Sequence, residues 1–125
     1  MNYKRLIAAL KFKQQRNSTY FIVKSEFEDK KQEFKIYPGG LLLFTDIPAG
    51  DPDYVFMSII YKTKPLRSNI IISDKDEGLI KLKYTDLANL IIAKKVEAYY
   101  TDKNAMDREI YDIINENKGE MNNGG

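Results

Sequence analysis

The chain of 125 residues contains neither histidine nor cysteine. Ser-His-Asp and Cys-His catalytic arrangements are therefore impossible within it, and so are zinc sites built from nitrogen and sulfur ligands. General acid–base chemistry would depend on carboxylates, lysine or tyrosine. Because no catalytic set stands out among these, we predict a protein that is not an enzyme and that carries no cofactor.

Carboxylates are the remaining route to metal chemistry, and they crowd two segments. Asp46, Asp51 and Asp53 fall within eight residues and could gather Mg²⁺ for a carboxylate-dependent nuclease. Aspartate beside proline and glycine is also typical of turns, which is the interpretation we favour. The acidic segment 74–78 begins like a calcium loop, but its twelfth position is Thr85 instead of glutamate. We predict no metal site.

Lysine and tyrosine offer a different chemistry, because lysine neutralises phosphate and tyrosine stacks on unpaired bases. The chain has nine tyrosines, and several lie close in sequence to basic residues, such as Tyr20 near Lys24. The same residues also suit half-buried strands and exposed sheet edges. Our first hypothesis is single-stranded DNA or RNA bound on a Lys/Tyr-rich sheet face, through Lys62, Lys64, Arg67, Lys81 and Lys83, with Tyr61 as a stacking group and a second cluster at Lys11, Lys13 and Arg16.

The second hypothesis is a protein-binding module, either an adaptor, a complex subunit or a small inhibitor of a host complex. It rests on acidic residues around the apolar stripe of the last predicted helix, at Asp107, Glu109, Asp112 and Glu116. Such a helix could dock onto a basic partner, cover this protein's own basic face or simply be solvated. The composition also suits an accessory protein of a virus or mobile element.

Charge is unevenly distributed along the chain. Residues 1–96 carry 17 basic and 11 acidic side chains, whereas residues 97–125 carry 3 basic and 7 acidic ones. Such asymmetry indicates an electrostatic partner or ordinary solvation. The first 15 residues have no signal-peptide h-region, and no apolar run approaches the roughly 20 residues of a membrane helix. We therefore expect a cytoplasmic protein that does not contact membranes.

Hydrophobic spacing predicts a strand-rich middle part. Alternation over 20–27 followed by a turn predicts a hairpin with 33–37, and further strands are expected at 41–47, 54–61, 69–73 and 79–84. The last of these alternates cleanly, which places Lys81 and Lys83 on one outward face. The links between successive strands are too short for parallel crossovers, so the sheet should be mostly antiparallel.

Helices are predicted at both ends of this sheet. The i, i+3, i+4, i+7 spacing predicts a helix over 3–14, and Thr85 suits the N-cap of a second one. Periodicity leaves open whether 96–100 is helix or strand. A last helix is expected from about residue 105 to 115. The fold class is α+β, with a five- to six-stranded sheet and helices packed on it, in one domain over 1–117 followed by a flexible polar tail, 118–125.

Overall fold

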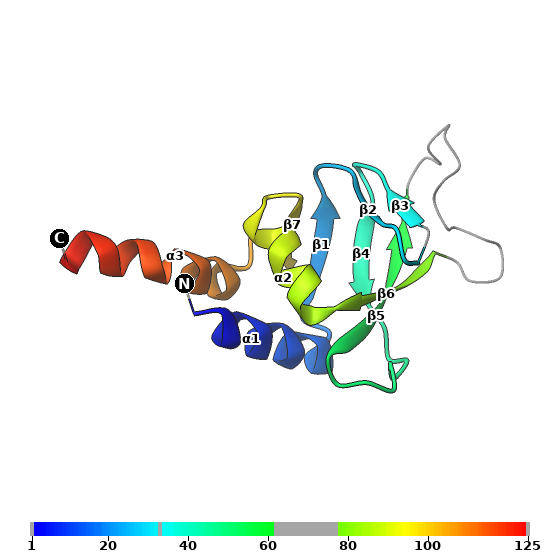
Figure 1. Ribbon diagram of the computed structural model, residues 1–125, viewed down its shortest axis with the longest axis horizontal. Coiled ribbons are helices and arrows are strands. Elements are labelled where there is room, and N and C mark those ends of the chain that lie inside the picture. Colours follow the sequence, from blue (N-terminus) through cyan, green and yellow to red (C-terminus); the bar gives the residue numbers. More distant parts are fainter. Residues whose placement is uncertain (1, 33, 62–77, 125) are drawn as a thin grey trace.

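The computed structural model describes residues 2–32, 34–61 and 78–124, and the side chains up to residue 116. The elements follow the order helix, six strands, helix, strand, helix (Figure 1). Their bounds are α1 Tyr3–Arg16, β1 Thr19–Val23, β2 Phe27–Asp29, β3 Phe34–Ile36, β4 Leu41–Phe44, β5 Tyr54–Ile60, β6 Leu79–Lys83, α2 Tyr84–Ile92, β7 Val96–Tyr100 and α3 Arg108–Gly124.

Five strands form one sheet in the order β6-β5-β4-β1-β7, and every neighbouring pair is antiparallel. β2 and β3 form a separate two-stranded sheet. The predicted α+β class is confirmed, with an N-terminal helix, an antiparallel five-stranded sheet and two further helices packed on it. The predicted strand at 69–73 lies outside the described residues.

The predicted hairpin between 20–27 and 33–37 is wrong in its first strand. β1 ends at Val23, and its backbone N–H and C=O bond to Gly40 and Gly39, which lead into β4. The next two amides, of Lys24 and Ser25, donate to the carbonyl of Lys95. This change of partner takes the chain off the large sheet, so the hairpin is made by the shorter β2 and β3.

Burial alternates along every strand of the large sheet, as expected for a sheet with one covered face. On the covered face, Phe21, Leu42 and Ile59 are almost completely buried. Apolar residues of α1, α2, α3 and the β2–β3 hairpin complete the same core: Leu6, Leu10, Leu87, Ile91, Ile110, Ile113, Phe27, Phe34 and Ile36. Residues 96–100 form a strand that pairs with β1, and its inward side chains, Val96 and Ala98, extend this core.

The ends of the helices differ in detail from the prediction. Thr85 lies inside the first turn of α2, and Lys83 occupies the cap position without a side-chain hydrogen bond. α3 starts later than expected, after Asp107, whose carboxylate accepts a hydrogen bond from the Ile110 amide. Figure 1 shows α3 continuing away from the sheet to Gly124, so the predicted domain limit at residue 117 falls inside this helix. Within the described ranges, no helix has the length and apolar character needed to cross a membrane.

Candidate nucleic-acid interface

The second face of the large sheet carries side chains that are mostly half-buried. None of them belongs to the cluster of core residues that the described helices and hairpin cover. We call this surface the open face. Strand alternation and register assign to it Tyr20, Ile22, Leu41, Leu43, Tyr54, Phe56, Ser58, Ile60, Leu79, Lys81, Lys83, Glu97 and Tyr99.

Two tyrosines form one end of the open face. Tyr20 of β1 and Tyr99 of β7 are directly opposite in register, and their rings stack at a centroid distance of 5.5 Å with 16° between the planes. The Tyr20 hydroxyl donates to Asn104 Oδ1, and the Tyr99 hydroxyl donates to Glu97 Oε1. Burial and the Glu97 carboxylate raise the pKa of Tyr99, so its hydroxyl is neutral at physiological pH. The two rings at this end are thus neutral, and the Glu97 carboxylate lies beside them.

The other end combines aromatic rings with two lysines. Lys81 and Lys83 of β6 lie opposite Phe56 and Tyr54 of β5. The Lys81 ammonium is 4.7 Å from the ring centroid of Tyr54, and that of Lys83 is 5.6 Å from the same ring. Neither lysine forms an ion pair with an acidic residue of the described segments. Both lysines also line a cleft that contains acidic residues, among them Asp29 and Asp86.

Aliphatic residues separate the two ends. Leu41 and Leu43 of β4 lie opposite Ile22 and Tyr20 on one side and opposite Ile60 and Ser58 on the other. Ile60 is 47% exposed. The single acidic residue assigned to the open face is Glu97, which pairs with Lys24 at 3.4 Å. The middle of this surface is therefore apolar and nearly uncharged.

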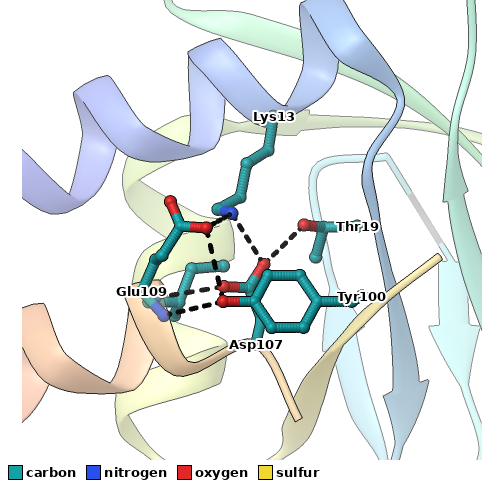
Figure 2. A network of polar contacts seen from close by, with 6 residues as sticks. Lys13, Thr19, Tyr100, Asp107 and Glu109 are labelled. Atoms are coloured by element: carbon teal, nitrogen blue, oxygen red, sulfur yellow. Dashed lines mark hydrogen bonds and ion pairs between the residues drawn. The ribbon is translucent and has the colours of Figure 1, made fainter. Parts of the chain in front are cut away.

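Lys13 and Asp107, predicted to contact nucleic acid and protein respectively, contact each other in the interior (Figure 2). Their nitrogen and oxygen are 2.9 Å apart, and the side chains are 5% and 0% exposed. Asp107 also accepts a 2.6 Å hydrogen bond from Thr19. These contacts place both residues in the core, so neither is offered to a partner. Both assignments are corrected on this ground.

The acidic helix largely contacts the protein itself, which is one of the possibilities that its sequence suggests. Glu109 lies 3.5 Å from the Lys13 ammonium, and Glu116 pairs with Arg5 of α1. Of the four predicted acidic residues, Asp112 is exposed without such a pair among the described residues. Two acidic residues of α3, Glu109 and Glu116, thus lie against basic residues of α1.

Of the other predicted basic residues, Lys11 lies near the lysine end of the open face. It is half-buried above the ring of Tyr84, and it lines a cleft of about 430 Å³ together with Tyr54 and Lys83. Arg16 is exposed above Phe12 of the same helix. Lys62, Lys64 and Arg67 lie outside the described residues. From the predicted basic set, the structure therefore brings together Lys81, Lys83 and Lys11.

Tyr61, the predicted stacking residue, is held by contacts within the protein. Its hydroxyl accepts from the Tyr37 amide at 2.9 Å and donates to the Tyr37 carbonyl at 2.7 Å. Burial raises its pKa, and its ring packs so closely on Gly40 that a Cβ there would lie 2.9 Å from the ring. Tyr61 therefore fixes the chain at Tyr37 and is itself partly buried.

Sequence reasoning did not assign the aromatic residues Tyr20, Tyr54, Phe56 and Tyr99 to the site. Their signal is the alternation of each strand, which puts them on the face opposite to the core. Using that signal requires the strand order, because β1 and β7 are neighbours in space and far apart in sequence. The strand order depends on tertiary contacts that periodicity does not reveal.

Two further surface features carry weaker chemistry. A cleft of about 1300 Å³ between the β2–β3 hairpin and α2 adjoins the lysine end of the open face, because Tyr54, Lys81 and Lys83 line it. Its other lining residues carry charges of both signs, including Asp29, Asp86, Lys35 and Lys95. It therefore does not favour a ligand of one charge. In the loop before β5, the Asp51 carboxylate accepts from the Asp53 amide, as in an aspartate turn. No group of acidic side chains in the described part of the chain is arranged to hold a metal ion.

Comparison of the chain with models of protein families, with curated proteins and with solved structures finds no match. The site is therefore interpreted from its own geometry.

Proposed function

We propose that this protein is a non-catalytic binding protein that holds single-stranded DNA or RNA on the open face. The observation that carries the proposal is that four aromatic residues and two lysines share one face of the sheet. Aromatic rings stack on unpaired bases, and a sheet surface can present several rings at once. Lysine ammonium groups neutralise the phosphates that connect those bases.

The arrangement favours single strands over duplexes. In a duplex the base faces are stacked on each other, so rings such as Tyr20 and Tyr99 would have no partner surface. Recognition of duplex sequence usually needs a helix or ribbon with polar side chains that enters the major groove. The open face is a broad sheet surface with an apolar middle, which suits splayed bases.

The direct test is fluorescence anisotropy with a labelled single-stranded DNA, a single-stranded RNA and a duplex, each at two salt concentrations. We expect a single strand to bind more tightly than the duplex and to bind less tightly as salt rises. In the variant Lys81→Ala/Lys83→Ala, affinity should fall and the slope of log K against log salt should flatten by about 0.7 for each lost phosphate contact.

A matched control is Lys4→Ala/Lys94→Asn, which removes two exposed lysines, one on α1 and one in the turn between α2 and β7, that line neither cleft beside the open face. Asparagine suits the left-handed backbone at residue 94. This variant should bind like the unmodified protein. Absence of binding to all three nucleic acids at low salt would refute the proposed function. Equal losses of affinity in the two double variants would show that nucleic acid does not bind specifically at the open face.

A second candidate, an apolar protein partner, is favoured by the aliphatic middle of the open face and by the exposure of Ile60. The variant Ile60→Lys separates the two functions because its expected effects have opposite signs. It adds positive charge and should strengthen binding of nucleic acid. It should abolish a complex with a protein that depends on burying apolar area there.

A further inference from the structure

The polar groups of the open face are few, and those of Tyr20, Tyr99 and Glu97 already have partners. The hydroxyls of Tyr20 and Tyr99 donate to Asn104 and Glu97. Glu97 also pairs with Lys24. Apart from the two lysines, the hydroxyls of Ser58 and Tyr54 are the remaining polar groups assigned to this face. The face therefore offers few groups that could read the hydrogen-bonding edge of a base.

Reading a base requires such groups. Sites that select one base over another place donors and acceptors against its edges, and each good pair contributes about 1–3 kcal/mol of discrimination. Stacking is tolerant of sequence because every base has a π face, and lysine interacts with phosphate irrespective of the base attached to it. The open face supplies stacking through its four aromatic residues and phosphate contacts through its two lysines.

The two aromatic ends are also separated in space. Tyr20 on β1 and Phe56 on β5 have β4 between them, so they are two strand spacings apart. That separation is roughly 10 Å. Between them lie Leu41 and Leu43, which can contact bases only through apolar surface. A ligand that uses both ends must cross the strands and must contain more than one nucleotide.

From this geometry, and resting on the proposed function, we infer that the open face binds single strands independently of base sequence. The strand crosses β7, β1, β4 and β5, with bases stacked at the Tyr20–Tyr99 end and at the Tyr54–Phe56 end. Its phosphates meet Lys81 and Lys83 beside the second of these ends. Affinity is set by length and charge, and base identity contributes little.

The test compares labelled dT12, dC12, dA12 and a mixed-sequence 12-mer under one buffer condition, together with dT2 as a short ligand. We expect the four 12-mers to bind within about tenfold of one another and dT2 to bind far more weakly. A preference of more than a hundredfold for one 12-mer would overturn sequence-independent binding and leave the proposed function intact. Failure of every oligonucleotide to bind would instead overturn both.

Two variants test the use of both aromatic ends. Tyr20→Leu/Tyr99→Leu and Phe56→Leu keep apolar side chains and remove the rings, and each should weaken all four 12-mers by about tenfold or more. Phe12→Leu is the control, because this ring is 50% exposed on α1 and lies outside the open face. Loss of affinity for one 12-mer alone would contradict the inference.

Ultraviolet crosslinking of the unmodified protein to dT12 gives an answer that does not depend on the folding of variants. Crosslinked peptides are expected to contain Tyr20 or Tyr99 and, separately, Tyr54 or Phe56. Crosslinks confined to other surfaces would overturn the path proposed across the strands.

Discussion

Lys13 is a basic residue whose charge is used inside the molecule. It projects from α1 between Asp107, Glu109 and the ring of Tyr100, so one ammonium joins the first helix to the start of the last one. Asp107 in turn holds the hydroxyl of Thr19 and the first turn of α3. A buried ion pair with such hydrogen bonds is sensitive to the loss of either partner.

Replacing Lys13 with methionine should lower the free energy of unfolding by about 3 kcal/mol, because it leaves the Asp107 carboxylate buried without its cation. The measurement is urea unfolding followed by circular dichroism. Lys4→Met, at an exposed position of the same helix, is the control and should change stability by no more than about 0.5 kcal/mol. Similar stabilities for the two variants would contradict a structural role for this ion pair.

Tyr84 gives a prediction for alkaline pH. Burial raises its pKa, so the folded protein keeps a proton that the unfolded chain loses near pH 10. Its contribution to stability is fully present below that pH and is lost as the pH rises through the folded pKa, by up to about 1.4 kcal/mol per pH unit. Tyr84→Phe should therefore lose less stability between pH 8 and pH 11 than the unmodified protein. Parallel unfolding curves at these two values provide the measurement, and equal losses would argue against the shift.

At the scale of elements, the sequence predicted the positions of strands and helices better than it predicted which strands pair. A run that is apolar on both faces at 54–61 and the alternation at 79–84 correctly indicated β5 and β6, and helical spacing indicated α1. The strand that follows α1 was extended too far because Phe27 continues its alternation. Its backbone instead leaves the sheet at Lys24, which bonds to the carbonyl of Lys95, 71 residues later in the chain. Local patterns do not contain such a contact.

The connection into β6 depends on a glycine with a left-handed backbone. Gly78 has φ +74°, and a Cβ there would lie 2.5 Å from the carbonyl oxygen of Ile59. Gly50 has a similar φ of +78° but open space around it. Gly50→Ala should cost about 1 kcal/mol from backbone strain, whereas Gly78→Ala should cost at least about 2 kcal/mol because the strand must also move. Thermal unfolding of the two variants tests this order, and a larger effect at Gly50 would be inconsistent with the packing at β5.

At the scale of the whole molecule, the unevenly distributed charges of the sequence partly pair with one another inside the protein. Acidic residues at 107, 109 and 116 pair with Arg5 and Lys13 of α1. Part of the charge difference between residues 1–96 and 97–125 is therefore neutralised by contacts within the protein. The candidate site could be predicted at Lys81 and Lys83, since one clean alternation places them outward. Its aromatic part could not, because it joins strands that are brought together only by the tertiary fold.

Glu97 is the carboxylate that opposes a polyanion on the open face. Glu97→Gln should raise affinity for single-stranded DNA several-fold at low salt, and the gain should shrink as salt screens the charge. Asp112→Asn, an equal charge change on the exposed side of α3, should have a smaller effect. Anisotropy titrations at two ionic strengths measure both. An equal or larger gain from Asp112→Asn would show that net charge alone governs binding.

The position of β1 has a consequence for synthesis of the chain. β1 lies between β4 and β7, so it gains its second neighbour only after residues 96–100 have been synthesised. Its side chains, with Lys13 beside them, must wait for residues 96–113 before they are covered. Contacts of this separation slow folding and leave apolar surface exposed meanwhile. Nascent chains halted before β7 should therefore be captured by chaperones and cleaved by proteases, and resistance should arise in a single step once α3 has cleared the exit tunnel.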